Sequence, residues 1–322
     1  MSTPLVDMRD VTVRFSGARD VFAVNGVSLA LQPGETLSIL GESGSGKSVT
    51  LKTLLRLLPE NRTTIGGEVR VNGVDVLGLK GKALADHRGG MVSMIFQDPM
   101  LALDPVYSIG DQIAEAVVRH EGCSTSVGQA RALEMLTRVR IPSPERRLKA
   151  YPHEMSGGMR QRAMIALALA CRPKLLLADE PTTALDATVQ IQILLLLREL
   201  QREFGMGMIF VTHDIGVAVE ISDRVAVMYA GQFVETGAVR EIIRDPKHPY
   251  TKGLLAANLH GAVKGDRLDA IPGAPPPLET APNSCSFAPR CGLKEQRCES
   301  ALPPAVELGV NRFVRCIHAA GA

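Results

Sequence analysis

The feature that most constrains the fold of this 322-residue sequence is a glycine-rich loop between an apolar run and a helical pattern. The apolar run covers residues 36–40, and leucines recur at helical spacing over residues 49–58. Between them lie Gly41, Glu42, Ser43, Gly44, Ser45, Gly46, Lys47 and Ser48, and Val49 follows. Glycines let the backbone curl with its N–H groups inward, and the following helix offers its positive end. We predict a phosphate-binding loop of the G-x-x-x-x-G-K-[ST] type, in which the lysine reaches outer phosphates and the serine binds Mg²⁺. An ordinary Gly/Ser turn is the alternative.

Charge and hydrophobicity exclude several other classes of protein. Lys and Arg number 36 and Asp and Glu 34, with no basic block, so the charge shows no nucleic-acid footprint. The longest apolar runs, at 163–171 and 193–197, are far shorter than the roughly 20 residues of a membrane span. Residues 1–10 lack the apolar core of a signal peptide. We therefore expect a chain that stays in the reducing cytoplasm, where its six cysteines do not form disulfides.

The chain changes character near its C-terminal end. Upstream, strand and helix patterns alternate, and β-rich segments at 11–15, 21–31 and 68–71 predict a small antiparallel layer. Five prolines then fall within eleven residues and predict a linker: Pro272, Pro275, Pro276, Pro277 and Pro282. Each motif occurs once, which disfavours a tandem chain.

A second candidate site follows an apolar run at 175–178. Asp179 and Glu180 come directly after it, as expected for a buried parallel strand whose carboxyl end carries two acids. Asp179 is predicted to join the Mg²⁺ shell and Glu180 to polarise the attacking water in phosphoryl transfer. The ordinary alternative is a strand that ends in solvated acids.

A third candidate site opens the helical pattern that runs from 156 to about 171. Ser156 is a candidate N-cap, and Gly157 and Gly158 let backbone N–H groups approach an anion. A second phosphate site in one chain makes sense if each nucleotide is shared between two subunits.

Together these residues resemble the nucleotide-binding subunit of an ATP-binding cassette (ABC) transporter over residues 4–260. The resemblance implies an α/β P-loop NTPase cassette with an antiparallel β-layer, a helical subdomain at about 98–156, and a small Cys-rich C-terminal extension. It makes 41–48 the Walker A loop, Ser156 to Gly158 the signature, and Asp179 and Glu180 the end of Walker B. Met155, Met159 and Thr183 depart from the commoner residues of the family, but none of these changes removes a phosphate donor.

The resemblance also assigns roles to single residues. Gln97 matches the Q-loop glutamine that binds the metal, Asp186 belongs to the D-loop with residues 183–185, and His213 matches the switch histidine. Phe15 looks like the aromatic residue that stacks on adenine. A surface amide, a structural histidine and a core aromatic are the respective alternatives.

The family mechanism implies a set of partners. Two cassettes close head to tail on ATP, and hydrolysis at Glu180 releases them. The second cassette is expected to be a paralogue, and two transmembrane permeases and an extracytoplasmic solute-binding protein complete the transporter. No nucleic acid is expected. The turn-rich, apolar segment 98–105 is the expected permease contact, with a buried loop as the alternative. This arrangement implies a peripheral location at the cytoplasmic face of the inner membrane.

The C-terminal segment resembles the oligopeptide and dipeptide importer branch, through 248–251, the proline segment and four cysteines. Nickel and glutathione importers are close relatives, so the transported substrate stays open. We expect Cys285, Cys291, Cys298 and Cys316 to bind a metal rather than fill a core, with [4Fe–4S] favoured by the branch and Zn²⁺ as the alternative. His318 could replace one thiol. We predict a cassette at 1–260 and a linker with the Cys-rich domain at 261–322.

The main competing class is a soluble ABC ATPase that acts on DNA or ribosomes. The DNA-repair members insert long heptad coiled coils between Walker A and the signature, and the translation-associated members carry two cassettes. The segment between Lys47 and Ser156 has no sustained heptads, and the chain has one cassette. The sequence therefore favours an importer ATPase.

Overall fold

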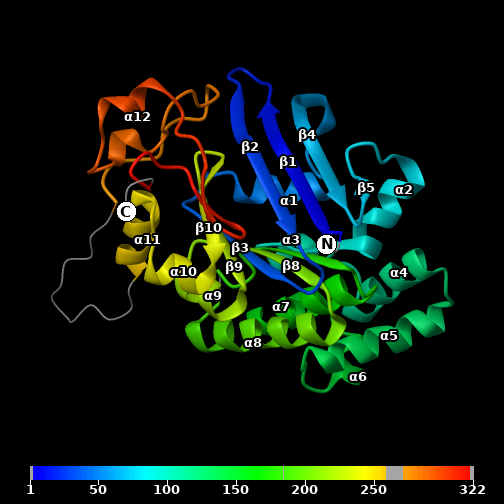
Figure 1. Ribbon diagram of the computed structural model, residues 1–322. Coiled ribbons are helices and arrows are strands. Elements are labelled where there is room, and N and C mark those ends of the chain that lie inside the picture. Colours follow the sequence, from blue (N-terminus) through cyan, green and yellow to red (C-terminus); the bar gives the residue numbers. More distant parts are fainter. Residues whose placement is uncertain (1–2, 184, 259–270, 320–322) are drawn as a thin grey trace. The chain divides into compact units, whose positions relative to one another are not determined.

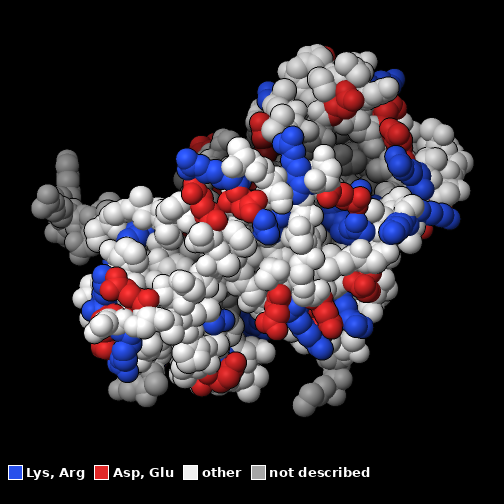
Figure 2. All heavy atoms as spheres, turned by 90° about the horizontal axis from the view of Figure 1, so that it is seen from above, with Lys and Arg blue, Asp and Glu red and all other residues white. Residues whose placement is uncertain are grey.

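The computed structural model describes residues 3–183, 185–258 and 271–319. The chain divides into two compact units, one made of Met1–Leu77 with Phe210–Ala322 and the other of Gly78–Ile209. Both units combine strands with helices, which confirms the predicted α/β class. Basic and acidic side chains are interspersed over the face shown in Figure 2.

The first unit contains an antiparallel sheet with the strand order β2-β1-β4-β5 (Figure 1). Its strands are β1 (Val6–Phe15), β2 (Val21–Leu31), β4 (Thr63–Val71) and β5 (Val74–Asp75). The predicted layer is confirmed, but β1 and β4 begin earlier than expected. In β1 the register shifts between Met8 and Val11, and Asp10 has a left-handed φ of 47°. This bulge breaks the alternation of buried and exposed residues, which hides the first half of β1 from a pattern search.

A second set of strands in this unit surrounds β3 (Thr36–Leu40), whose five residues are all buried. Strand β3 pairs in parallel with β9 (Arg224–Tyr229), which pairs antiparallel with β10 (Gln232–Ala238). The C-terminal hairpin of β11 (Val306–Gly309) and β12 (Arg312–Val314) continues this sheet, because Glu235 of β10 lies opposite Val314. The end of the chain is thus built onto the sheet that carries the glycine-rich loop.

Short helices complete the first unit. They are α1 (Lys47–Leu54), α9 (Ile215–Ile221), α10 (Val239–Arg244), α11 (Pro249–Asn258) and α12 (Gln296–Ser300), with single turns at Glu60–Arg62 and Ala288–Arg290. Residues 271–284 form no helix or strand, as expected for the proline segment. The backbone N–H of Phe22 nevertheless donates to the Leu278 carbonyl at 2.7 Å, so this segment is tied to β2. Residues 259–270, where we predict the domain boundary, lie outside the described residues.

The second unit contains the parallel pair β6 (Val92–Ile95) and β7 (Leu175–Asp179), in which Ile95 lies opposite Ala178. Its helices are α2 (Gly81–Asp86), α3 (Pro99–Ala102), α4 (Ile109–Glu121), α5 (Thr125–Arg138), α6 (Pro144–Arg147), α7 (Gly157–Leu169) and α8 (Ala187–Phe204), with short turns at His87–Met91 and Pro152–Glu154. Strand β8 (Gly207–Thr212) crosses the boundary between the two units.

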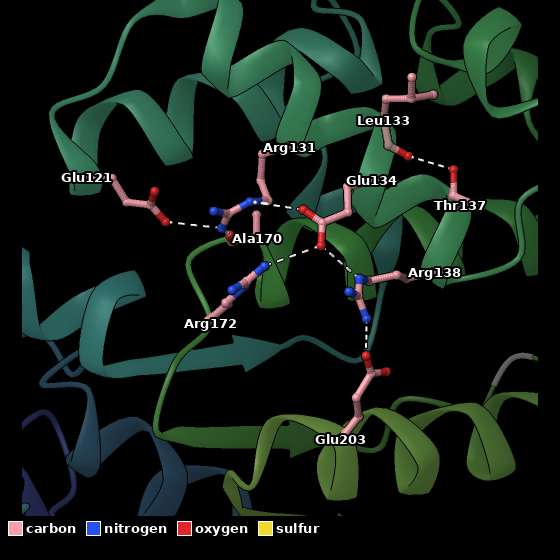
Figure 3. A network of polar contacts seen from close by, with 9 residues as sticks. All are labelled: Glu121, Arg131, Leu133, Glu134, Thr137, Arg138, Ala170, Arg172 and Glu203. Atoms are coloured by element: carbon pink, nitrogen blue, oxygen red, sulfur yellow. Dashed lines mark hydrogen bonds and ion pairs between the residues drawn. The ribbon is translucent and has the colours of Figure 1, made fainter.

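An ion-pair network joins the helices of the second unit (Figure 3). Glu134 of α5 accepts from Arg138 Nε at 2.9 Å and from Arg172 Nη2 at 3.3 Å, and lies 3.3 Å from Arg131 Nε. Arg131 also donates to the carbonyl of Ala170 at 2.8 Å, just past the end of α7. The network therefore fixes α5 against the segment that leads from α7 to β7.

Candidate functional site

The glycine-rich loop joins β3 to α1, and its backbone conformation requires glycine. Gly46 has φ of 106°, and a Cβ there would lie 2.4 Å from the carbonyl oxygen of Ala23. A Cβ at Gly41 would lie 2.2 Å from the Met228 carbonyl oxygen at the end of β9. Gly44 has φ of 78° and lies at the exposed tip beside Ser43. A side chain at 41 or 46 would force the loop out of this tight curl.

Lys47 and Ser45 place polar groups inside the curl. The Lys47 ammonium, 5% exposed, donates to the carbonyl oxygens of Gly41 at 2.8 Å and Glu42 at 2.9 Å. The buried Ser45 hydroxyl has no hydrogen-bond partner among the described residues. An unsatisfied buried hydroxyl is costly, so a ligand with acceptor oxygens fits this loop. Helix α1 begins at Lys47, and Ser48 and Val49 lie half-buried in its first turn.

Glu42 is held by residues far away in the sequence. Its backbone N–H donates to the Tyr250 hydroxyl at 2.9 Å. Its carboxylate accepts two bonds from Arg290, of 2.7 and 3.0 Å. Neither partner is predictable from the sequence, because nothing in the local pattern around 250 or 290 indicates a contact with the loop.

The acids at the end of β7 lie in different environments. Asp179 is 7% exposed, whereas Glu180 is half-buried and has a left-handed φ of 47°. The Thr183 hydroxyl donates to Glu180 Oε2 at 3.0 Å and to the Glu180 carbonyl at 3.2 Å. Thr183 therefore fixes the orientation of the Glu180 carboxylate, a contact that sequence reasoning did not predict.

The remaining single residues lie at strand ends, as predicted. Gln97 is exposed and follows β6, and since Ile95 pairs with Ala178, Gln97 and Asp179 leave the β6–β7 pair at the same edge. In the first unit, His213 is exposed directly after β8, and Phe15 is half-buried at the end of β1. Their predicted roles stay predictions.

Helix α7 has an open N-terminus. Ser156 is its N-cap, and the Ser156 hydroxyl accepts from the Met159 N–H at 3.4 Å. Ser156 and Gly157 are exposed, and a Cβ added to Gly157 would meet nothing within 4 Å. A Cβ on Gly158 would lie 3.1 Å from Val189 of α8. The first N–H groups of α7 are thus accessible to an anionic ligand.

Asp186 has a clear structural role as the N-cap of α8. Its carboxylate accepts from the Val189 N–H at 3.0 Å. Residue 184 of the same predicted D-loop lies outside the described residues.

The expectation that none of the four C-terminal cysteines fills a core is wrong for Cys298 and Cys316, which are buried. Cys285 and Cys291 pack on an apolar cluster that includes Tyr229, and Cys316 lies in the core of the C-terminal hairpin. Burial raises the pKa of the Cys285, Cys291 and Cys316 thiols, and the nearby Cys298 raises each further. All four are free thiols.

These thiols do not form a ready metal site. Within residues 3–183, 185–258 and 271–319, no group of three or more His, Cys, Asp or Glu side chains is arranged to hold a metal ion. His318 Nε2 lies 2.7 Å from the carbonyl oxygen of Leu293, and its Nδ1 lies 3.6 Å from Glu295. The thiol chemistry fits a metal, whereas the arrangement in the structure does not.

No helix among the described residues is both long and apolar enough to cross a membrane.

Comparison with known proteins gives two family matches. Residues 24–183 match the family described as ABC transporter, and residues 234–298 match the family described as oligopeptide/dipeptide transporter, C-terminal region. The second match covers strand β10 from Val234 onward, Tyr250, Arg290 and three of the four cysteines.

Similar full-length proteins come from several bacteria. The oligopeptide transport ATP-binding protein OppD of Salmonella typhimurium is 47% identical over 313 residues, which cover 97% of this chain and 93% of the relative. OppD of Bacillus subtilis is 46% identical over 316 residues, or 97% and 88%. A solved dimeric ATP-binding cassette, bound to ADP and Pi after hydrolysis, superposes with a TM-score of 0.66 at 31% identity over 73% of this chain and 99% of the cassette.

Proposed function

Because the chain belongs to the ATP-binding subunits of ABC transporters, in the oligopeptide and dipeptide branch, we propose a role for each of its candidate site residues in ATP binding and hydrolysis. The chain is an ATPase that energises the import of peptides through partner permeases and a partner ATPase subunit. The observation that carries this conclusion is the 46–47% identity to oligopeptide transport ATP-binding proteins over 97% of the chain, a span that includes the loop 41–49 and most of the C-terminal region.

We assign the nucleotide phosphates to the loop 41–49. The supporting observations are the curl that only glycine permits, the buried Ser45 hydroxyl, which has no partner in the part of the chain that the structure describes, and the buried Lys47 side chain. Mg²⁺, which screens phosphate charge, is assigned to Ser48, Gln97 and Asp179. Phe15 is assigned to the adenine ring.

Hydrolysis is assigned to Glu180, with His213 contacting the terminal phosphate. A carboxylate acts as a general base only when it is oriented toward the water, and the Thr183 hydrogen bond supplies an orientation. The exposed N-terminus of α7, with Ser156, Gly157 and Gly158, is assigned to the ATP held by the partner cassette. Asp186 is assigned to the same interface through the helix that it caps.

The permeases are proposed to contact the apolar segment that contains α3. Within the predicted segment 98–105, Leu101 is 87% exposed and Met100 44%, and directly after it Val106 is 70% exposed and Tyr107 56%. Adjacent exposed apolar side chains of this size are typical of a protein contact. The proposed location is peripheral, at the cytoplasmic face of the inner membrane, with an extracytoplasmic solute-binding protein and a paralogous second ATPase in the complex.

The test of the catalytic assignment is Glu180→Gln. The variant is expected to bind ATP with the wild-type affinity but to turn it over about 100-fold more slowly or worse, because the amide cannot take a proton from water. Phosphate release and equilibrium ATP binding are both measured. Glu145→Gln, at an exposed position on α6, is the matched control and keeps wild-type turnover. Unchanged turnover in Glu180→Gln would show that another group is the base.

We also propose that Cys285, Cys291, Cys298 and Cys316 bind a [4Fe–4S] cluster, with Zn²⁺ as the alternative. Support comes from the four free thiols and from the hydrogen bond of 2.9 Å between the Cys285 N–H and the Cys298 carbonyl, which holds these two residues together. Iron, acid-labile sulfide and zinc are measured per chain after anaerobic purification. Iron with sulfide supports the cluster, and zinc without iron supports the alternative. Absence of both metals shows that the thiols are core residues only.

A further inference from the structure

The side chain of Glu42, a residue of the phosphate loop 41–49, contacts the C-terminal extension, here residues 271–319. Glu42 Oε2 accepts from Arg290 Nη1 at 2.7 Å, and Oε1 accepts from Nη2 at 3.0 Å. Two parallel bonds between a carboxylate and a guanidinium fix both position and orientation. The Arg290 side chain is 5% exposed and that of Glu42 27%, so solvent screens this pair far less than a surface pair.

The extension holds Arg290 rigidly. Its Nε donates to the Pro272 carbonyl at 2.8 Å, and its Nη2 to the Ile271 carbonyl at 3.3 Å. The guanidinium also lies 6.0 Å from the ring centroid of Phe287 and 5.8 Å from that of Tyr229. The proline segment and the turn between Cys285 and Cys291 therefore set where the guanidinium lies.

The same aromatic cluster fixes the backbone of Glu42. Tyr250 accepts the Glu42 N–H, and its ring lies 4.6 Å from Tyr229 and 5.4 Å from Phe287. The Glu42 carbonyl in turn accepts from the Lys47 ammonium. Glu42 thus connects Arg290 to Lys47, which is assigned to the nucleotide phosphates.

We propose that Arg290 is a positioning residue for ATP binding: through Glu42 it holds the phosphate loop in its binding shape, so that the C-terminal extension sets the affinity of the ATPase for its nucleotide. This inference rests on the proposed function of the loop. It gives the extension a role in the ATPase cycle that requires no bound metal.

The test is Arg290→Gln in the full chain, with the KM for ATP and kcat measured separately. The KM is expected to rise about tenfold, because the loop loses its anchor, whereas kcat at saturating ATP stays close to the wild-type value because Glu180 is untouched. Arg290→Lys is not expected to restore the KM, since an ammonium cannot make the two parallel bonds. Arg297→Gln is the matched control, because the Arg297 side chain is 70% exposed in the same extension and pairs with nearby Glu295 rather than with the loop.

A double-mutant cycle with Glu42→Gln keeps the proposal falsifiable. The double variant Glu42→Gln/Arg290→Gln removes both charges, so it is expected to fold even if Arg290→Gln alone is too unstable because the half-buried Glu42 carboxylate has lost its partner. Its KM is expected to be no higher than that of either single variant, as residues of one pair are not additive. A folded double variant with the wild-type KM, or additive effects, overturns the proposal. Failure of the wild-type chain to hydrolyse ATP would instead overturn the proposed function.

Discussion

Glu180 illustrates how one residue combines strain with orientation. A left-handed φ of 47° is unfavourable for a glutamate, and such conformations occur where the surrounding structure enforces them. Here the Thr183 N–H and hydroxyl both bond to the Glu180 carbonyl, at 3.4 and 3.2 Å. The turn therefore fixes the backbone of Glu180 while the same hydroxyl reaches its carboxylate.

Thr183→Val tests this orientation at the residue scale. The change keeps the shape of the side chain but removes the hydroxyl, and a lost hydrogen bond of about 1 kcal/mol corresponds to a kcat roughly fivefold lower. Steady-state phosphate release measures the effect. Thr183→Ser is the control and should keep turnover, because it retains the donor. Equal kcat values for Thr183→Val and the wild type would contradict the positioning role of the hydroxyl.

The residues of the candidate site were easier to predict from the sequence than the distant residues that contact them. The spacing of 41–48 indicates a phosphate loop because the chemistry lies in one short segment, and the structure confirms the strand–loop–helix context. Arg290 carried no such signal, because its partner Glu42 lies 248 positions away. The same limit applies to Tyr250, whose hydroxyl bonds to the loop backbone.

Helix α5 is the element whose placement depends most visibly on charge. Burial alone would raise the pKa of Glu134, but the hydrogen bond and charge of Arg138 and the charges of Arg172 and Arg131 outweigh it and lower the pKa. A carboxyl with a lowered pKa contributes stability above its unfolded pKa, and this contribution is lost as the pH falls through the folded pKa.

Glu134→Gln is therefore expected to destabilise the second unit by about 1 kcal/mol at neutral pH, a modest effect because the carboxylate is partly exposed. Urea denaturation followed by circular dichroism measures the free energy of unfolding. The loss should shrink in high salt and in acid, where the wild-type network is already weakened. Glu199→Gln breaks only the exposed pair with Arg140 and is the control. A Glu134→Gln variant as stable as this control would show that the network contributes nothing.

At the element scale, the bounds of helices were easier to predict from the sequence than short strands and strand irregularities. The sequence pattern predicts helices at 109–120 and 127–139, and the structure has them at 109–121 and 125–138, because each is amphipathic and serine-capped. The β11–β12 hairpin was not predicted, since each strand has at most four residues and is recognisable only by its pairing with β10. The bulge in β1 likewise depends on pairing rather than on local pattern.

For the molecule as a whole, the C-terminal segment is part of the first unit rather than an appendage to it. His248, at the start of this segment, is buried, and burial lowers its pKa to about 3. Its Nδ1 accepts from the Tyr250 N–H at 3.0 Å, which requires the neutral ring. Its own backbone N–H donates to the fully buried Glu235 of β10.

The lowered pKa of His248 predicts how the stability of the whole chain depends on pH. Below about pH 6.5 the unfolded state binds a proton at His248, whereas the folded state keeps the ring neutral. Acidification therefore favours the unfolded state, so the free energy of unfolding is highest above pH 6.5 and falls as the pH is lowered. Between pH 6.5 and 4 the loss approaches about 1.4 kcal/mol per pH unit.

His248→Asn can keep an acceptor for the Tyr250 N–H but does not titrate. Its free energy of unfolding, measured by urea denaturation, should be lower than that of the wild type at pH 7 and should fall less steeply toward pH 5. His153→Asn, at an exposed site, should keep the wild-type slope. Parallel slopes for His248→Asn and the wild type would show that His248 takes up its proton at the same pH in the folded and the unfolded chain, which contradicts a lowered pKa.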